Sequence, residues 1–387
     1  MNISIKNFLY TAAGLVIFTW TFTSSSHALN IFSSTQEKSY SHILKLQTYT
    51  LNTRNVKIVK AQKNKLWIGT TRGAIRYDIS TYDDYVIFDN KNSLLSNGIF
   101  AIEIAPNGFP WIGTYGGGIS RFDGKKWANI NTPHGLADAF VFDIQFAGDS
   151  VWLATWSGVN LIRGNPFLRS SWQTFTVENT KKGLIDNWVY AIQIDSQNRL
   201  WFGTESGLSL YDGKSWRSWT NENGLGAPYK KVASANQGVT AIFQGVHHNR
   251  HYPDHSKSTV NYRPNYIISM KLDKDQNLWI GDWGGGLSMI DTKTMKFKNF
   301  TTQEGLPGNY ILALEEDKWG NLWIGTNNGL SRFNGKTFTN YSKINGLNSD
   351  FIFSLEFTSD NSLWTGGHYG LDRISLNPST GEPQNRQ

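Results

Sequence analysis

The sequence of 387 residues contains no cysteine. Disulfide bonds, thiolate zinc sites, cysteine nucleophiles and a thioether lipid anchor are therefore excluded. Charged residues make up only 17% of the chain, which argues against a charge-rich disordered protein and against a coiled coil. The net charge is +7, but no run of lysine and arginine of the kind that follows a phosphate backbone occurs. We therefore expect no nucleic-acid partner.

Aromatic residues and glycine, in contrast, are abundant. The chain has 16 Trp, 16 Tyr and 22 Phe, together 14% of its residues, and 37 Gly against 10 Pro. Aromatic residues favour strands, and glycine favours the tight turns that join them. The composition therefore predicts an all-β protein.

Residues 1–28 have the features of a secretory signal peptide. Lys6 supplies a positive charge, residues 8–22 are largely apolar, and Ser26 and Ala28 fit a small-residue cleavage site. The alternative is an uncleaved anchor, but the apolar stretch is shorter than the ~20 residues that span a bilayer. We expect a periplasmic or secreted protein with no transmembrane segment in the mature chain.

A motif centred on tryptophan recurs along the chain. Clear copies are LWIGTTRGAIRYD from Leu66, LWFGTESGLSLYDGKSW from Leu200 and LWIGTNNGLSRFNGKTF from Leu322. The tryptophans of the seven copies are Trp67, Trp111, Trp152, Trp201, Trp279, Trp323 and Trp364, at spacings of 44, 41, 49, 78, 44 and 41 residues. Each copy contains four strand signals separated by turn signals, and a four-stranded unit of this period is typical of a β-propeller blade. The tryptophans are expected to pack between blades.

We therefore predict an all-β fold, a seven-bladed β-propeller of four-stranded antiparallel blades, over residues 29–376. The last copy lacks a fourth strand, whereas residues 44–49 form an isolated strand pattern before the first copy. We predict that this N-terminal strand completes the last blade and closes the ring. Residues 377–387 are expected to form a polar tail. The turn at residues 273–277 resembles the start of a calcium loop but lacks its later glycine and glutamate, so a plain hairpin turn is predicted.

A ligand site is expected at the central mouth of one face. In a propeller the first strand of each blade lies nearest the axis, and the loop before it opens on the same face as the loop between the second and third strands. Residues at these two positions vary among the copies although the scaffold does not. The candidate ligand-binding residues are Arg54, Tyr115, Phe140, Trp156, Trp188, Glu205, Tyr266, Trp283, Tyr310, Asn327, Phe351 and His368.

The chemistry of these residues favours a carbohydrate. Aromatic rings stack on the C–H faces of a pyranose, and polar neighbours pair with its hydroxyl groups. The predicted ligand is therefore a glycan or another small molecule, bound without a cofactor. The alternative interpretation is that the rings only plug the narrow end of the channel.

The spacing of 78 residues indicates an insertion at about residues 226–264, which leads into the fifth blade. Four of the eight histidines of the chain lie in it, between residues 247 and 255. His247, His251 and His255 are candidate metal ligands, although Pro253 argues against one helix that would align them. The alternative is a solvated loop near the mouth.

The repeat resembles the two-component regulator propeller repeat, G-L-x-x-N-x-(V/I) followed by D-x-x-G-x-L-W-I-G-T-x-x-G-L. Residues 305–335 match this pattern nearly throughout, residues 183–213 match it as well, and the resemblance covers about residues 44–376. It implies a periplasmic ligand-binding sensor domain of the kind often joined to hybrid histidine kinases that respond to glycans. Here the chain is expected to stand alone without a kinase, so a membrane signalling or envelope protein would be its partner.

Three functions remain open. The first is an exported ligand-binding or sensor-type propeller that acts with a separate partner. The second is a metal-assisted lyase or another enzyme, since propellers of the streptogramin lyase type have similar repeats and use a histidine with a metal. The third is a protein–protein interaction scaffold. No nucleophile elbow or paired-carboxylate motif is visible, so we expect binding rather than catalysis.

Overall fold

The computed structural model describes residues 43–50, 55–81, 84–237 and 262–386. The predicted signal peptide, Arg54 and the three candidate metal ligands His247, His251 and His255 lie outside these ranges. No helix within them is long and apolar enough to cross a membrane. The described residues belong to one compact unit, which covers residues 42–387.

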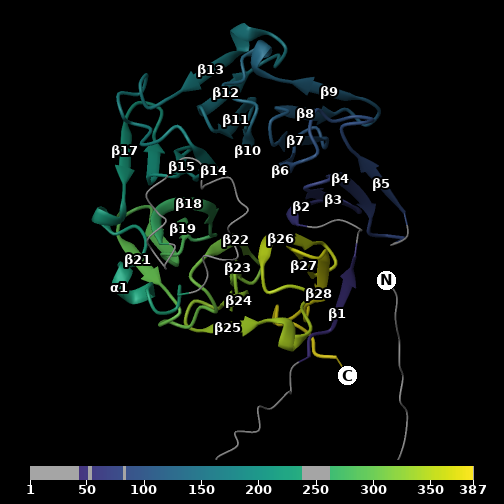
Figure 1. Ribbon diagram of the computed structural model, residues 1–387, viewed down its shortest axis with the longest axis vertical. Coiled ribbons are helices and arrows are strands. Elements are labelled where there is room, and N and C mark those ends of the chain that lie inside the picture. The colour runs from purple at the N-terminus through teal and green to yellow at the C-terminus, as the bar shows by residue number, and fades with distance from the viewer. Residues whose placement is uncertain (1–42, 51–54, 82–83, 238–261, 387) are drawn as a thin grey trace, which may run out of the picture. The chain divides into compact units, whose positions relative to one another are not determined.

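In the described part of the chain, seven four-stranded antiparallel sheets form the blades of a ring (Figure 1). Blade 1 contains β2 (Val56–Gln62), β3 (Lys65–Thr70), β4 (Gly73–Asp78) and β5 (Tyr85–Phe88). Blade 2 contains β6 (Ile99–Ile104), β7 (Pro110–Thr114), β8 (Ile119–Phe122) and β9 (Trp127–Ile130). Blade 3 contains β10 (Val141–Ala147), β11 (Ser150–Thr155), β12 (Gly158–Arg163) and β13 (Trp172–Phe175). Blade 4 contains β14 (Val189–Ile194), β15 (Leu200–Thr204), β16 (Leu208–Tyr211) and β17 (Trp216–Trp219).

The remaining blades have the same organisation. Blade 5 contains β18 (Arg263–Leu272), β19 (Asn277–Trp283), β20 (Leu287–Asp291) and β21 (Phe297–Phe300). Blade 6 contains β22 (Ile311–Glu316), β23 (Leu322–Thr326), β24 (Gly329–Phe333) and β25 (Phe338–Tyr341). Blade 7 contains β26 (Ile352–Thr358), β27 (Ser362–Gly367), β28 (Leu371–Ser375) and β1 (Leu46–Tyr49). A short helix, α1 (Tyr229–Val232), lies in the insertion, and short 3-10 turns lie at residues 132–134, 169–171, 221–223 and 343–345.

The ring closes as predicted, with an N-terminal strand in the last blade. Strand β1 pairs antiparallel with β28, and the strand order of that blade is β1-β28-β27-β26. The backbone N–H of Leu44 also donates to the carbonyl of Asn345 at 2.9 Å. Both ends of the propeller are therefore held in one sheet, which leaves no unpaired blade.

The inner strand of each blade contacts the inner strands of both neighbouring blades, so these seven strands surround the axis (Figure 1). The inner strands share a pattern that begins with a buried valine or isoleucine. These first residues are Val56, Ile99, Val141, Val189, Ile267, Ile311 and Ile352. In every blade the pairing register shifts directly after this residue, which indicates a β-bulge. The bulge leaves one residue per blade outside the ladder. These residues, which we call the second residues, are Lys57, Phe100, Phe142, Tyr190, Ile268, Leu312 and Phe353.

The seven repeat tryptophans are all buried, with at most 6% of each side chain exposed, which confirms their predicted packing role. Each packs toward the next blade. Trp67, for example, lies in a cluster with Ile99 and Ile112 of blade 2, and Trp201 lies with Ile267 and Ile280 of blade 5. Large rings at one fixed place in every blade thus fill the wedge between neighbouring sheets.

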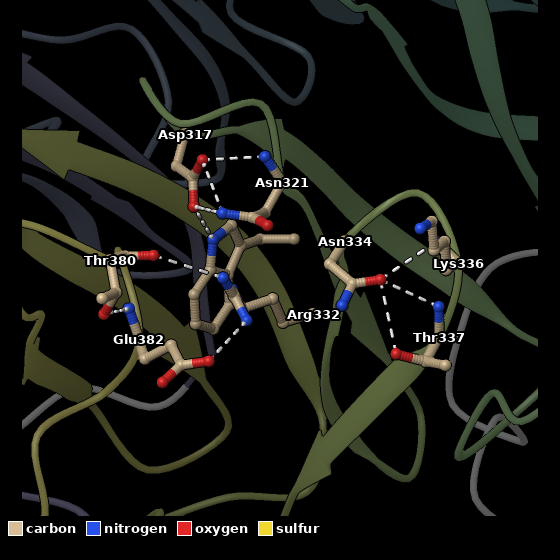
Figure 2. Close-up of polar contacts among 9 residues, drawn as sticks. Asp317, Asn321, Arg332, Asn334, Lys336, Thr337, Thr380 and Glu382 are labelled. Carbon is tan, nitrogen blue, oxygen red and sulfur yellow. Dashed lines mark hydrogen bonds and ion pairs between the residues drawn. The ribbon is translucent and has the colours of Figure 1, made fainter.

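The turn before the repeat tryptophan is held by an aspartate (Figure 2). The buried carboxylate of Asp317 accepts hydrogen bonds from the backbone N–H groups of Trp319 and Asn321, at 3.0 and 2.8 Å. It also accepts from the Asn321 amide at 2.8 Å and from the Trp323 indole at 2.9 Å. Asp273 does the same for Trp279 at 2.9 Å, so the turn that resembles a calcium loop is a hairpin turn whose carboxylate is already used.

Residues 377–386 fold back onto the propeller. Leu376 forms a bridge with Pro383, and Leu44 forms one with Asn385. The guanidinium of Arg332 donates to the Thr380 carbonyl at 3.4 Å and lies 3.6 Å from Glu382 (Figure 2). The segment that the sequence suggests is only a polar tail therefore adds backbone pairing beside β1.

Candidate functional site

In each blade, the residue directly before the buried valine or isoleucine that begins the inner-strand pattern lies at the mouth. The loop between the second and third strands lies at the same face. The pairing of Val56 with Thr70 places Asn55 at this position in blade 1. The sequence comparison places Arg54 there, one residue too early, because the hairpin between β2 and β3 is one residue shorter than that of blade 2. Arg54 itself lies outside the described residues.

Aromatic rings from blades 2 to 4 form a stacked series on one side of the mouth. Phe140 and Trp156 are stacked with their centroids 4.5 Å apart, and Trp156 and Trp188 are stacked at 5.5 Å. The Tyr115 ring meets Phe140 edge-on at 4.4 Å. All four side chains are partly exposed. We call Phe140, Trp156 and Trp188 the stacked triplet.

Three other candidate rings, from blades 5 and 6, are buried instead. Tyr266 is 3% exposed, Trp283 8% and Tyr310 0%, and they form one cluster with Tyr190. Tyr266 stacks on Trp283 at 5.5 Å, and Trp283 meets Tyr310 edge-on at 5.5 Å. In this structure these rings pack against one another rather than presenting faces to solvent. The predicted rim is thus divided into an exposed side and a buried side.

Glu205 belongs to the buried side. Its carboxylate accepts a hydrogen bond from the Tyr190 hydroxyl at 3.1 Å and lies 3.5 Å from the guanidinium of Arg263. Burial raises the pKa of Glu205, and the Tyr190 hydrogen bond and the Arg263 charge partly offset that rise. Burial likewise raises the pKa of Tyr190 far above its usual value. These groups join blade 4 to the start of β18.

His368 and Phe351 meet on blade 7, where it adjoins blade 1. Their ring centroids are 4.8 Å apart. The His368 Nδ1 lies 2.5 Å from the side-chain oxygen of Asn55, which assigns the proton to Nδ1 because that oxygen can only accept. Burial, followed by the charges of Lys57 and Lys343, lowers the pKa of His368. The imidazole is therefore neutral at physiological pH. Asn327 stands on blade 6 with its side-chain oxygen 3.4 Å from the backbone nitrogen of Tyr310.

The described ends of the insertion are fixed to the mouth face of blades 5 and 6. The Tyr262 hydroxyl donates to the Ala227 carbonyl at 2.6 Å. The buried Asn236 amide donates to the Gly284 carbonyl at 2.7 Å and its oxygen accepts from Asn309 at 3.0 Å. Among residues 43–237 and 262–386, apart from short gaps, no group of three His, Asp or Glu side chains is placed to hold a metal.

Two cavities of the described structure lie away from the mouth. One of about 430 Å³ lies between blades 3 and 4 at their hairpin ends, where Ala147 and Ser150 are among its lining residues. Another of about 650 Å³ lies at the C-terminal segment, lined by Lys45 and Glu382 among others. Neither of these two cavities includes a candidate site residue.

Asp282 departs from a pattern that five of the other blades share at this face. Five blades have a threonine whose hydroxyl donates to a glycine carbonyl of the following turn: Thr70, Thr114, Thr155, Thr204 and Thr326. In blade 5 the fully buried Asp282 accepts from the Gly285 N–H at 2.5 Å, and its second oxygen has no hydrogen-bond partner among the described residues. Burial raises the pKa of Asp282 well above its usual value, and the hydrogen bond from the Gly285 N–H offsets only part of that rise.

Asp282→Thr should therefore stabilise the protein, and more so at high pH. A carboxyl whose pKa is raised by folding binds its proton more tightly in the folded state, so stability is lost as pH rises above the unfolded value of about 4. Threonine removes that loss and the unpaired oxygen, a gain of about 1–3 kcal/mol at pH 8 and less at pH 5. Denaturant titrations at both pH values measure this. The reciprocal Thr326→Asp should destabilise blade 6, and an equal effect of Asp282→Thr at both pH values would contradict the account.

Sequence reasoning missed Lys57 and Asn55. Lys57 could have been found from the sequence by comparing the second residues of the seven inner strands. Six of them are apolar or aromatic, and Lys57 is the one charged residue. Lys57 is partly buried, and its ammonium lies 4.0 Å from the centroid of the Phe353 ring.

Comparison with known proteins agrees with this architecture. The family model described as "Two component regulator propeller" matches residues 183–206, 261–284 and 305–328. Among curated proteins, histidine kinase P4 of Formosa agariphila is 28% identical over 162 residues, which are 39% of this chain and 12% of the kinase. The chain therefore spans a small part of that relative.

Solved structures show the same fold at low identity. The extracellular domain of a protein assigned to a hybrid two-component system of B. thetaiotaomicron superposes with a TM-score of 0.68 at 23% identity, covering 88% of this chain and 42% of that one. Virginiamycin B lyase of Staphylococcus aureus superposes with a TM-score of 0.62 at 13% identity, covering 86% and 100%. These likenesses establish the fold alone. Together with the matched repeats they confirm the resemblance: the chain is a seven-bladed β-propeller that carries two-component regulator propeller repeats.

Proposed function

We propose that this chain is an exported, sensor-type propeller that binds an oligosaccharide at the mouth and acts with a separate signalling or envelope protein. The observation that carries the proposal is the stacked triplet. It offers partly exposed, nearly parallel rings from two adjacent blades, with interplanar angles of 20° and 24°. Because the rings cover one another's faces, a sugar would pack its C–H face against the exposed outer face and edges of this stack.

The loops that carry the triplet are held in place by equivalent polar pairs. In blade 3, Asp138 accepts from the Phe140 N–H at 3.0 Å and from the Ser157 hydroxyl at 2.7 Å. In blade 4, Asp186 accepts from the Trp188 N–H at 3.0 Å and from the Ser206 hydroxyl. These bonds fix the rings before a ligand arrives, which lowers the entropic cost of binding. The same partly exposed polar groups lie beside the rings, where ligand hydroxyls would need partners.

The exported location and the sensing role rest on the comparisons. The neighbour from B. thetaiotaomicron is an extracellular domain of a two-component system, and the curated relative is a histidine kinase. The predicted signal peptide at residues 1–28 agrees with an exported site of action. Because this chain covers 42% of the first and 12% of the second, the signalling step itself is assigned to another protein or segment.

Trp188→Ala should weaken oligosaccharide binding about 30-fold, because a stacked aromatic anchor typically contributes about 2 kcal/mol to an interface. Calorimetric titration of the mature protein with a panel of neutral and acidic oligosaccharides measures the effect. The unfolding midpoint should fall only modestly, because Trp188 is partly exposed, although it also packs against the buried cluster of Tyr190 and Tyr266. Phe167→Ala is the matched control, because Phe167 is 41% exposed and lies outside the mouth. Absence of binding to every sugar, or equal binding by Trp188→Ala, would contradict the proposal.

A further inference from the structure

We infer that the ligand carries an anionic group, a carboxylate or a sulfate ester on a sugar, and that the ammonium of Lys57 binds it at the junction of blades 1 and 7. This inference rests on the proposed function and narrows its ligand class. Three observations support it: the internal symmetry of the propeller, the surroundings of Lys57, and the ion pairs that the other lysines of the inner strands, Lys60 and Lys271, form with glutamates.

Internal symmetry singles out Lys57 as a departure from the scaffold. It occupies the bulge position of its inner strand, and the register of all seven blades makes the comparison direct. The other second residues carry no charge: Phe100, Phe142, Tyr190, Ile268, Leu312 and Phe353. Folding of a blade does not require a cation at the second residue, since the other six blades have apolar or aromatic side chains there.

Among the described residues, no carboxylate pairs with Lys57. Its ammonium lies over the Phe353 ring at 4.0 Å, and no hydrogen bond or ion pair joins it to the described residues. The His368 ring meets the same Phe353 ring edge-on at 4.8 Å. The charges of both Lys57 and Lys343 act on His368. The described part of this corner therefore holds two cations and no counter-ion for Lys57, and burial lowers the pKa of Lys57 to about 8 because no anion there stabilises its charge.

Charges deeper in the channel behave differently. Lys60, three residues further along β2, forms an ion pair with Glu103 at 2.9 Å, and Lys271 forms one with Glu315. Glu356 accepts the Ala61 N–H at 3.0 Å and also acts on Lys60. Both of these lysines are therefore paired with carboxylates, and glutamates outnumber lysines among the groups named. The burial of Lys57 without such a partner is unfavourable in the free protein, and an anionic ligand group would relieve it.

The second residues also connect this corner to the stacked triplet. Phe100 and Phe142 are 5.3 Å apart, and Phe142 lies 5.5 Å from Trp156. A sugar chain that stacks on the triplet and extends along this lining toward blade 1 would bring an acidic substituent toward Lys57. A charge-assisted hydrogen bond at a partly desolvated ammonium is among the stronger polar contacts in proteins.

The test compares three probes by calorimetric titration at pH 6.5: trigalacturonate, its neutral methyl ester, and a sulfated galactose oligosaccharide. Wild-type protein should bind one of the acidic probes at least tenfold more tightly than the ester, and the acid that binds identifies the group as carboxylate or sulfate. Lys57→Met should remove that preference, whereas the control Lys60→Met, on the same strand, should retain it. The preference should also weaken as pH rises through 8, because only the ammonium form attracts an anion.

The outcomes separate this inference from the proposed function. An acid preference that survives Lys57→Met, or equal binding of ester and acids, overturns the inference. If only neutral sugars bind, in a manner that depends on Trp188, this inference fails and the proposed function stands. If no oligosaccharide binds, both fail. Thermal unfolding of Lys57→Met serves as the folding control, and its midpoint should equal or exceed that of wild type because an unbalanced charge has been removed.

Discussion

A chain that begins at Thr50 should fail to form a cooperatively folded ring, whereas a chain that begins at His42 should unfold at the midpoint of the full-length protein. The difference between the two is β1 and the residues just before it. We expect the shorter chain to lose more than 10 °C in its unfolding midpoint or to aggregate, as measured by calorimetry and by size-exclusion chromatography.

The reason is that β1 covers the core of blade 7. Its Tyr49 ring lies 5.2 Å from the repeat tryptophan Trp364, which is fully buried, and the Leu44 side chain is 2% exposed. The Thr48 hydroxyl donates to the buried Asp372 at 2.6 Å. Removing these groups exposes apolar surface and unpairs β28, at a cost of several kcal/mol. Equal midpoints for the two chains would show that the ring does not depend on this closure.

Asp317→Ala should lower the free energy of unfolding by about 3 kcal/mol. The substitution leaves four donors of the turn without an acceptor, and the indole N–H of Trp323 and the Asn321 N–H groups are buried where water cannot replace the carboxylate. Chemical denaturation measures the loss, and the midpoint of thermal unfolding should fall by roughly 5–10 °C.

The matched control is Asn334→Ala in the same blade (Figure 2). Asn334 also accepts several hydrogen bonds, from the N–H groups of Lys336 and Thr337 at 3.0 and 2.9 Å and from the Thr337 hydroxyl at 3.3 Å, but its turn is exposed. Water can replace those bonds, so the loss should stay below about 1 kcal/mol. If the two variants lose equal stability, burial of the Asp317 network is not what stabilises the blade.

The fold is predictable from the sequence because its determinants are local and repeated. Each tryptophan, each hairpin turn and each strand pattern recurs at one period, so the copies support one another's assignment. Ring closure was also predictable, since one strand pattern was in excess at residues 44–49 and one was missing after Ser375. Burial of all seven tryptophans and the pairing of β1 with β28 confirm these predictions.

The candidate site was predictable only as a set of positions. Which rings stay exposed depends on tertiary contacts: Tyr266, Trp283 and Tyr310 form the buried centre of one cluster, whereas Trp156 and Trp188 pack against its edge and stay partly exposed. The shift from Arg54 to Asn55 comes from one missing hairpin residue, which only the strand register reveals. The bulges that set the second residues apart are likewise invisible in a pattern of simple alternation.

The measurement that tests the central claim most directly is hydroxyl-radical footprinting of the mature protein with and without the tightest-binding oligosaccharide of the panel. The account predicts protection of Tyr115, Trp156 and Trp188 at the mouth, and unchanged reactivity of Tyr85 and Phe167, which are 53% and 41% exposed on outer parts of the blades. Protection confined to those outer residues, with the stacked triplet unchanged, would contradict a ligand site at the mouth.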